Sequence, residues 1–279
     1  NAENLGDCDL VVRTAAVHDS NPEIAGAVAR GIPVYERAQA WGAIMQRYPN
    51  ALCVAGTHGK TTTTSMCTHI FMAAEADPTV MIGGTLPILG TGHRVGKGKT
   101  IILESCEYCN SFLSFYPTVA VILNIEADHL DFFKDLEDIR HSFHQFAALL
   151  PEDGTLIINH DIQNYEEIFA GLSCNVITYG SSADADYSFQ NVSYNEKGCV
   201  AFDLVEKGII TDHIQLSVTG DHNVSNALAA IATAKLLNIS MPVIEKGLLS
   251  FSGTDRRFEY KGTLDGITIV DDYAHHPTE

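Results

Sequence analysis

The sequence predicts an α/β protein with a mainly parallel central sheet. Apolar runs alternate along the chain with segments of helical periodicity, an order typical of parallel strands joined by crossover helices. The runs at 100–105, 119–125 and 154–160 are rich in β-branched residues and are bounded by turn signals. Buried parallel strands have this composition, because helices cover both of their faces.

The first fifty residues contain one such series. A strand is expected at 9–15 and a helix at 21–31, with Asn21 as the helix cap, Pro22 at its first position and Gly31 at its end. The same order then repeats, with a strand at 32–36 and a helix at 37–48.

A second and longer series starts with a strand at 51–55. Helices are expected at 136–150 and at 222–238, the latter being rich in Ala and Leu. From about Val176 the pattern changes to short alternating strands, which predicts an antiparallel flap or sheet edge. The residues 259–279 are expected to form a hairpin that leads into a strand.

The chain is acidic, which limits the partners it can bind. Its 279 residues carry 17 Lys and Arg against 35 Asp and Glu, a net charge of −18. This charge disfavours general binding to nucleic acids or anionic membranes, although a few local cations allow an anionic substrate in one cleft. No stretch of 18 apolar residues occurs, so no membrane span is expected.

The seven cysteines are odd in number and scattered in spacing. This pattern favours free thiols in a reducing cytoplasm over a disulfide framework. Cys106 and Cys109 form a lone Cys-x-x-Cys pair without a second pair at zinc spacing, so we interpret them as ordinary thiols, with metal or redox use as the alternative. The first ten residues lack the basic and apolar regions of a signal peptide.

A glycine turn between a strand and a helix is the strongest functional signal. The stretch CVAGTHGKTTTTSM places Gly56 and Gly59 ahead of Lys60 and Thr61. Glycines let backbone N–H groups approach an anion, and the helix N-terminus adds partial positive charge. Lys60 can neutralise β- and γ-phosphates, and Thr61 can ligate Mg²⁺. The match is to a shortened P-loop, since Val54 stands where the full pattern has glycine, and a simple turn with an exposed lysine is the alternative.

Acidic residues follow two of the expected strands. Glu104 ends the strand at 100–105, and Glu107 lies close by. The run NIEADHLDFF follows the next strand and brings His129 and several carboxylates to the same edge. Open α/β sheets bind ligands at this carboxyl edge, so the residues predict metal or phosphate binding. Solvated strand ends and loops are the alternative.

Polar pairs late in the chain suggest nucleotide binding. Asn223 and Asn226 lie three residues apart on one helix face, where amides can read a purine edge or cap the helix. Arg256 and Arg257 follow a glycine turn and suit a phosphate or carboxylate, with a surface pair as the alternative. A weaker metal-like pattern comprises Asp271, Asp272, His275 and His276.

Taken in order, these segments resemble the Mur ligases. The resemblance rests on GTHGKTTTTSM, ESCEYCNSFLSFYPTVAVILNIEADHLDFF, HNVSNALAAIA and DRRFE…DDYAHHPTE, and it runs along the whole chain. It implies a central P-loop-type ATPase domain at 49–254, flanked by two partial Rossmann-like domains. Residues 1–48 would be the later part of the domain that binds the UDP-sugar. Residues 255–279 would begin a truncated domain for the amino acid.

The resemblance also implies roles for single residues. Lys60 would hold phosphates, Thr61 and Glu104 a first Mg²⁺, and His129 a second. Arg257 would meet the γ-phosphate. The rest of the nucleotide site would comprise Gly56, Thr57, His58, Gly59 and Thr62 in the loop, Asn223 and Asn226 at the adenine, and Asp272 at the ribose. Several sibling ligases complete the second ion with a carbamylated lysine. No Lys occurs here between Lys134 and Lys197, so its completion stays open.

The implied reaction is ADP-forming amide synthesis. The carboxylate of UDP-N-acetylmuramate would attack ATP to give an acyl phosphate, and L-alanine would then displace phosphate, a cytoplasmic step of peptidoglycan and cell-wall synthesis. No nucleic-acid or membrane partner is expected, and the sequence does not determine an oligomeric state. A ligase acting on a peptide or a folate, and a non-catalytic nucleotide-binding protein, are the alternatives. Lacking most of the third domain, the chain is expected to bind nucleotide better than it turns over.

Overall fold

The computed structural model of the protein describes residues 1–255, 259–272 and 274. Its helices are α1 (Pro22–Ala29), α2 (Arg37–Met45), α3 (Lys60–Ala73), α4 (Leu136–Ala147), α5 (His222–Leu236) and α6 (Met241–Ser250), with 3₁₀ turns η1 (Ala2–Leu5), η2 (Tyr108–Ser114) and η3 (Tyr165–Phe169). Its strands are β1 (Val11–Arg13), β2 (Val34–Glu36), β3 (Asn50–Ala55), β4 (Thr79–Leu86), β5 (Thr91–Arg94), β6 (Thr100–Glu104), β7 (Val119–Ile122), β8 (Thr155–Asn159), β9 (Asn175–Tyr179), β10 (Tyr187–Tyr194), β11 (Cys199–Glu206), β12 (Ile209–Thr219), β13 (Glu259–Leu264) and β14 (Ile267–Asp271).

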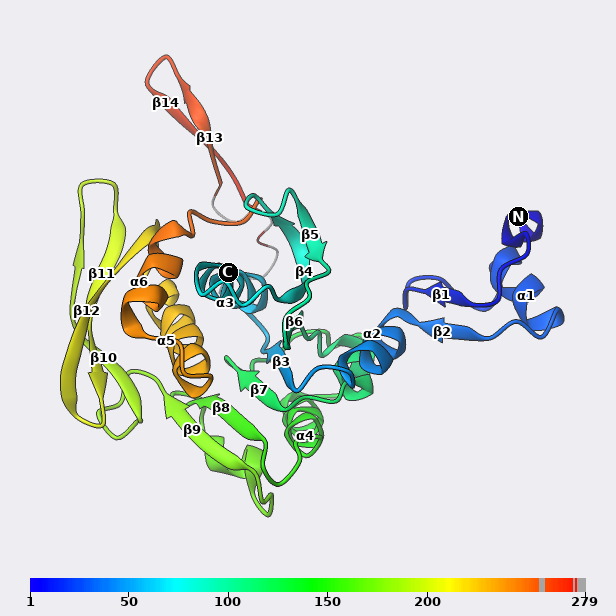
Figure 1. The fold of residues 1–279 in the computed structure, drawn as a ribbon, viewed down its shortest axis with the longest axis horizontal. Helices are drawn as coiled ribbons and strands as arrows, with labels where there is room; N and C mark the ends of the chain where they lie inside the picture. The colour runs from blue at the N-terminus through cyan, green and yellow to red at the C-terminus, as the bar shows by residue number, and fades with distance from the viewer. Residues whose placement is uncertain (256–258, 273, 275–279) are drawn as a thin grey trace.

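A ten-stranded sheet forms the centre of the molecule (Figure 1). Its strand order is β12-β11-β10-β9-β8-β7-β3-β6-β4-β5, and the strands from β9 to β4 pair in parallel. This confirms the predicted mainly parallel sheet. β10, β11 and β12 pair antiparallel, as the change of pattern after Val176 predicted. The order places β3 between β6 and β7, so the carboxyl ends of these three strands are neighbours.

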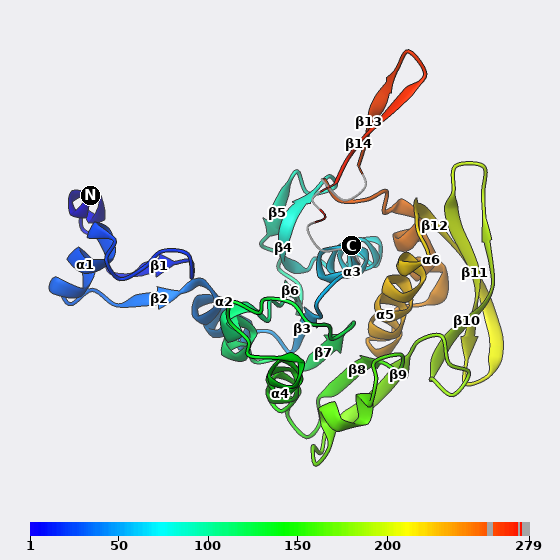
Figure 2. The ribbon, with the colours of Figure 1, turned by 180° about the vertical axis from the view of Figure 1, so that it is seen from behind.

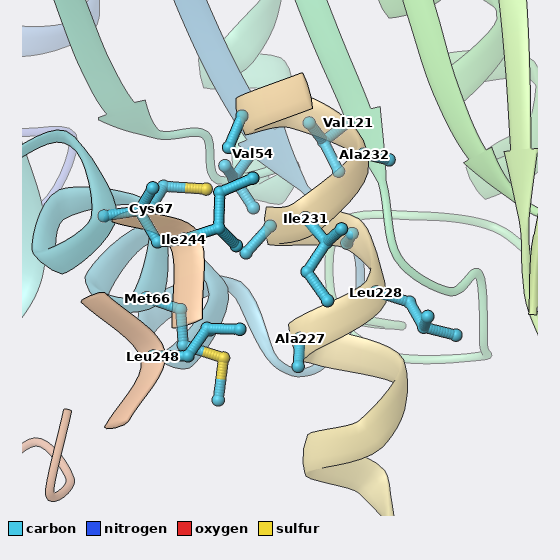
Figure 3. Packing of buried hydrophobic residues seen from close by; sticks show 14 of the residues in the cluster. Val54, Met66, Cys67, Val121, Ala227, Leu228, Ile231, Ala232, Ile244 and Leu248 are labelled. Atoms are coloured by element: carbon cyan, nitrogen blue, oxygen red, sulfur yellow. The ribbon is translucent and has the colours of Figure 1, made fainter. Parts of the chain in front are cut away.

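Helices cover both faces of the parallel strands. On β3, Leu52 and Val54 point into a core built from α3, α5 and α6, whereas Ala51 and Cys53 point into a second core under α2 and α4. This alternation follows from the two-residue period of a strand. Figure 3 shows the first core, where Met66 of α3, Ile231 of α5 and other apolar side chains meet beside the sheet. Burial on both faces explains why the parallel strands are apolar throughout.

The sequence patterns located most elements but not all of them. The expected helices and strands are present with ends that differ by a few residues, as at α4, which was expected to reach residue 150. The strands β4 and β5 and the helix α6 were not predicted. β9 was not predicted as a separate strand, and it pairs in parallel with β8 although the pattern from about Val176 predicted antiparallel strands. In β4, two glycines interrupt the apolar run TVMIGGTL, which weakens its strand signal.

The two ends of the described chain extend away from the large sheet (Figures 1 and 2). At the N-terminal end, β1 and β2 form a small parallel pair connected by α1, as the βαβ pattern predicted. At the other end, β13 and β14 form the predicted hairpin, on which Leu264 and Ile267 are about two-thirds exposed. Across the described residues, every helix is too short or too polar to cross a bilayer.

Candidate nucleotide-binding site

The predicted phosphate loop joins the end of β3 to the start of α3. Gly56 and Gly59 have φ angles of 146° and 82°, which L side chains rarely adopt. A Cβ at Gly59 would lie 2.6 Å from Oδ1 of Asn226, so the loop needs glycine for space as well. Gly59 is the N-cap of α3 and has no side chain to offer the first-turn N–H groups. Anions bind at helix N-termini of this kind.

Asn124 braces the loop from the segment that follows β7. Its Oδ1 accepts a hydrogen bond from the N–H of His58 at 2.7 Å, and its Nδ2 donates to the carbonyl of His58 at 3.0 Å. The N–H of Glu126 donates to Oγ1 of Thr57 at 2.9 Å. These bonds fix the loop backbone in one shape. The sequence interpretation did not single out Asn124, although its place directly after a buried strand was a signal.

The ammonium group of Lys60 is held by the loop and by a buried carboxylate. Nζ donates to the carbonyl oxygens of Gly56 and Thr57, the latter at 2.9 Å, and to Oε1 of Glu107 at 3.1 Å. Glu107 is only 2% exposed, and the side chain of Lys60 is 13% exposed. Because an unpaired buried charge is costly, each group compensates the other.

Thr61, in the first turn of α3, contacts Glu104 at the end of β6. Oγ1 of Thr61 donates to Oε1 of Glu104 at 3.0 Å, and the N–H of Gly83 donates to Oε2 at 2.7 Å. A Cβ at Gly83 would lie 2.8 Å from Oε1, so the glycine leaves room for the carboxylate. The pair thus combines a hydroxyl and a carboxylate oxygen, the hard donors that Mg²⁺ prefers. Gly83 was not predicted, because β4 was not.

His129 lies close to the same lysine–carboxylate pair. Its Nε2 is 4.0 Å from Oε1 of Glu107 and 3.9 Å from Oδ2 of Asp128. The ring of Tyr108 lies against it at a tilt of 38°, with centroids 4.7 Å apart, and the Tyr108 hydroxyl donates to Asp131 at 2.9 Å. That hydrogen bond to a carboxylate raises the pKa of Tyr108 to about 12. Tyr108 therefore orients His129, a contribution that the sequence did not reveal.

Asn223 and Asn226 support the loop from α5. Oδ1 of Asn226 accepts from Oγ1 of Thr63 at 3.2 Å, and its Nδ2 donates to Oδ1 of Asn223 at 3.0 Å. Both side chains are buried, and Asn223 also donates to the carbonyl of Thr219 at 2.7 Å. Here the amides join α5 to α3, and contact with adenine stays a prediction.

Five further residues were predicted to belong to the site. Arg256, Arg257, His275 and His276 fall outside the described residues. Asp272 follows β14, and its carboxylate accepts a hydrogen bond from the N–H of Ala274 at 2.6 Å. Its expected role at the ribose stays a prediction.

The oxygen ligands at this sheet edge fit one of the two expected magnesium ions. Thr61 and Glu104 supply two oxygen ligands side by side, which fits one Mg²⁺ whose other ligands are water and phosphate. Among the residues that the structure describes, no group of three or more His, Cys, Asp or Glu is arranged to hold a metal. Thr61 and Glu104 therefore fit the first magnesium ion. The second magnesium ion stays a prediction that rests on His129.

Comparison with known families decides what kind of protein carries this site. The model of the Mur ligase middle domain matches residues 54–234, and that of the Mur ligase family catalytic domain matches residues 1–49. The chain belongs to the Mur ligase family. In this Mur ligase, the matched middle segment contains the phosphate loop, Glu104, Glu107 and His129. The predicted domain limits near 48 and 254 stay predictions.

The chain is also similar to individual curated proteins and to solved structures. The chain is 53% identical to UDP-N-acetylmuramate–L-alanine ligase of Lachnospira eligens, over 98% of this chain and 60% of that protein. The enzyme of the same name from Caldanaerobacter subterraneus is 46% identical, over 100% and 60%. The crystal structure of UDP-N-acetylmuramate–alanine ligase from Thermotoga maritima matches with a TM-score of 0.86 and 29% identity, over 100% and 63%. This Mur ligase chain thus spans about 60% of the length of its curated relatives.

Proposed function

We propose that this chain is the nucleotide-binding part of an ATP-dependent ligase that joins L-alanine to UDP-N-acetylmuramate, forming ADP and phosphate. The observation that carries the proposal is its identity of about 50% to ligases of that name over nearly its whole length. The geometry supports it, because a glycine loop, a lysine and a hydroxyl–carboxylate pair lie together at one sheet edge. Such a reaction belongs to peptidoglycan synthesis, which we place in the cytoplasm.

Lys60, Thr61 and Glu104 each have a part in the proposed reaction. The muramate carboxylate attacks the γ-phosphorus of ATP, ADP leaves, and the amine of L-alanine then attacks the acyl phosphate and releases phosphate. Lys60 reduces the repulsion between carboxylate and triphosphate, and the loop N–H groups orient the phosphates. Thr61 and Glu104 would hold Mg²⁺, which supplies charge neutralisation at the phosphate oxygens. Arg257 and His129 are further candidates for contact with the reacting groups.

The replacement Lys60→Ala tests the proposal. In a protein that includes the remaining length of the relatives, we expect it to lower ATP-dependent L-alanine ligation on the order of 100- to 1,000-fold, because one cation is lost from the transition state. Alanine-dependent ADP release is the measurement. As the matched control, Lys134→Ala removes a lysine whose side chain is 87% exposed and should leave the rate unchanged. Near-normal turnover by Lys60→Ala would refute the assignment.

A peptide-joining ligase is the second candidate. The structure of UDP-N-acetylmuramate:L-alanyl-γ-D-glutamyl-meso-diaminopimelate ligase from Neisseria meningitides matches with a TM-score of 0.81 and 25% identity, over 92% of this chain and 83% of that one. Offering L-alanine and the tripeptide in one reaction separates the candidates. We expect the L-alanine product, and a predominance of the tripeptide product would favour the second candidate.

A further inference from the structure

Glu107 occupies a position that the proposed reaction does not explain. Its carboxylate is 2% exposed and lies at the mouth of the phosphate loop. Oε1 accepts a hydrogen bond from Nζ of Lys60 at 3.1 Å, and Oε2 lies 3.0 Å from the same nitrogen without hydrogen-bond geometry. A second negative charge at a site for anionic phosphates opposes their binding, so its presence needs a physical reason.

The hydrogen bonds of Lys60 supply that reason. An ammonium group has three N–H donors, and Nζ bonds to three protein acceptors: two loop carbonyls and Glu107. The carbonyls belong to the backbone of the loop itself, which Asn124 fixes in place. Of the three acceptors, Glu107 is therefore the one on a side chain that can turn away. A phosphate that accepts a hydrogen bond from Lys60 must therefore replace Glu107 as the acceptor.

An imidazole also lies near the carboxylate of Glu107. Nε2 of His129 lies 4.0 Å from Oε1 of Glu107, so the imidazole offers a second polar partner to a carboxylate that turns away from Lys60. The ring of Tyr108 contacts this imidazole, with centroids 4.7 Å apart. Glu107 thus lies within 4.0 Å of polar atoms on both Lys60 and His129.

We propose that Glu107 is a positioning residue that keeps Lys60 over the loop as its counter-ion and that nucleotide phosphates must displace it. The inference rests on the proposed function, because it requires that the loop binds nucleotide. Its consequence is that the carboxylate lowers the affinity for nucleotide while it stabilises the empty fold.

The replacement Glu107→Gln tests this competition in the chain of 279 residues. ADP is titrated by calorimetry in the presence of EDTA, so that no divalent ion contributes. We expect Glu107→Gln to bind ADP about tenfold more tightly, because phosphate then competes with a neutral amide instead of a charge-assisted hydrogen bond. The thermal unfolding midpoint without nucleotide should fall, because the partly buried Lys60 loses its counter-ion. Glu152→Gln, an exposed replacement ahead of β8 at the opposite edge of the sheet, should change neither quantity.

The outcomes separate this inference from the proposed function. If Glu107→Gln loses stability and its ADP affinity is equal to or weaker than that of the wild type, Glu107 is only structural and the inference is wrong. The nucleotide site of the proposed function would still stand, provided that the wild type binds ADP and Lys60→Ala weakens that binding. If the wild-type chain binds no ADP at millimolar concentration, the proposed nucleotide site fails, and the inference fails with it.

Discussion

Oγ1 of Thr61 donates a hydrogen bond to Oε1 of Glu104 at 3.0 Å, which joins the first turn of α3 to the last residue of β6. The two residues are 43 positions apart in the chain, and they meet because β3 and β6 are adjacent parallel strands. Two oxygens that could share one Mg²⁺ are therefore brought together by the sheet order alone.

Replacing Thr61 by valine tests this pair. Thr61→Val keeps the shape of the side chain but removes the hydroxyl, so we expect Mg²⁺ to strengthen ADP binding about tenfold less than in the wild type, equivalent to ~1.4 kcal/mol. Thr61→Ser retains the hydroxyl and should behave like the wild type. Titrations of ADP with and without Mg²⁺ measure the difference. An unchanged magnesium effect in Thr61→Val would rule out the hydroxyl as a ligand.

Gly83 is predicted to control the position of Glu104. In Gly83→Ala, the added Cβ would lie 2.8 Å from Oε1, so the carboxylate must move away from Thr61. We expect a weaker magnesium effect on ADP binding, with the free energy of unfolding changed by less than about 1 kcal/mol, since Gly83 is exposed. In a Glu104→Gln background, Gly83→Ala should have no further effect on magnesium. If the two replacements lowered the magnesium effect additively, Gly83 would not act through Glu104.

Asn226 on α5 is predicted to stabilise the start of α3, which follows the loop. Asn226→Ala leaves the hydroxyl of Thr63 and the amide oxygen of Asn223 without this partner in a buried place. We expect the free energy of unfolding to fall by about 1–3 kcal/mol and ADP affinity to fall with it. Denaturant unfolding measures the first quantity and calorimetry the second. A variant as stable as the wild type would contradict the account of these amides as structural links.

His69 should make stability depend on pH. Its side chain is buried, its Nδ1 lies 2.8 Å from Oγ of Ser250, and burial lowers its pKa from 6.5 to about 4. Between these values the unfolded chain binds a proton that the folded chain does not, so stability falls as pH drops from about 6.5 toward 4. The His69 contribution is at most about 3 kcal/mol. Comparing wild type and His69→Gln isolates it, because the other groups titrate in both, and parallel pH profiles would contradict it.

Local patterns and residue order predicted much of the fold. The parallel strands were visible because both faces are buried, which makes their sequences apolar throughout. β4 was missed because two glycines interrupt its apolar run, of which Gly83 leaves room for Glu104. α6 was missed because it is short and begins with Met241 and Pro242. The mainly parallel sheet, the antiparallel flap and the final hairpin are confirmed.

The site could be predicted only in part. Lys60, Thr61, Glu104 and His129 were singled out because each opens a helix, ends a strand or lies in the segment after one, and the sheet order brings such ends together. Asn124, Gly83 and Tyr108 were missed because each acts through a contact with one partner that is distant in sequence. The pairing of Lys60 with Glu107 is of the same kind, since no spacing rule relates residues 47 positions apart.

A structure of this chain with magnesium and a non-hydrolysable ATP analogue tests the central claim most directly. The account predicts the triphosphate against the N-terminus of α3, with Lys60 bonded to phosphate oxygens and with Thr61 and Glu104 beside one metal ion. A nucleotide bound elsewhere, with Lys60 still on Glu107 and the loop unaltered, would contradict it.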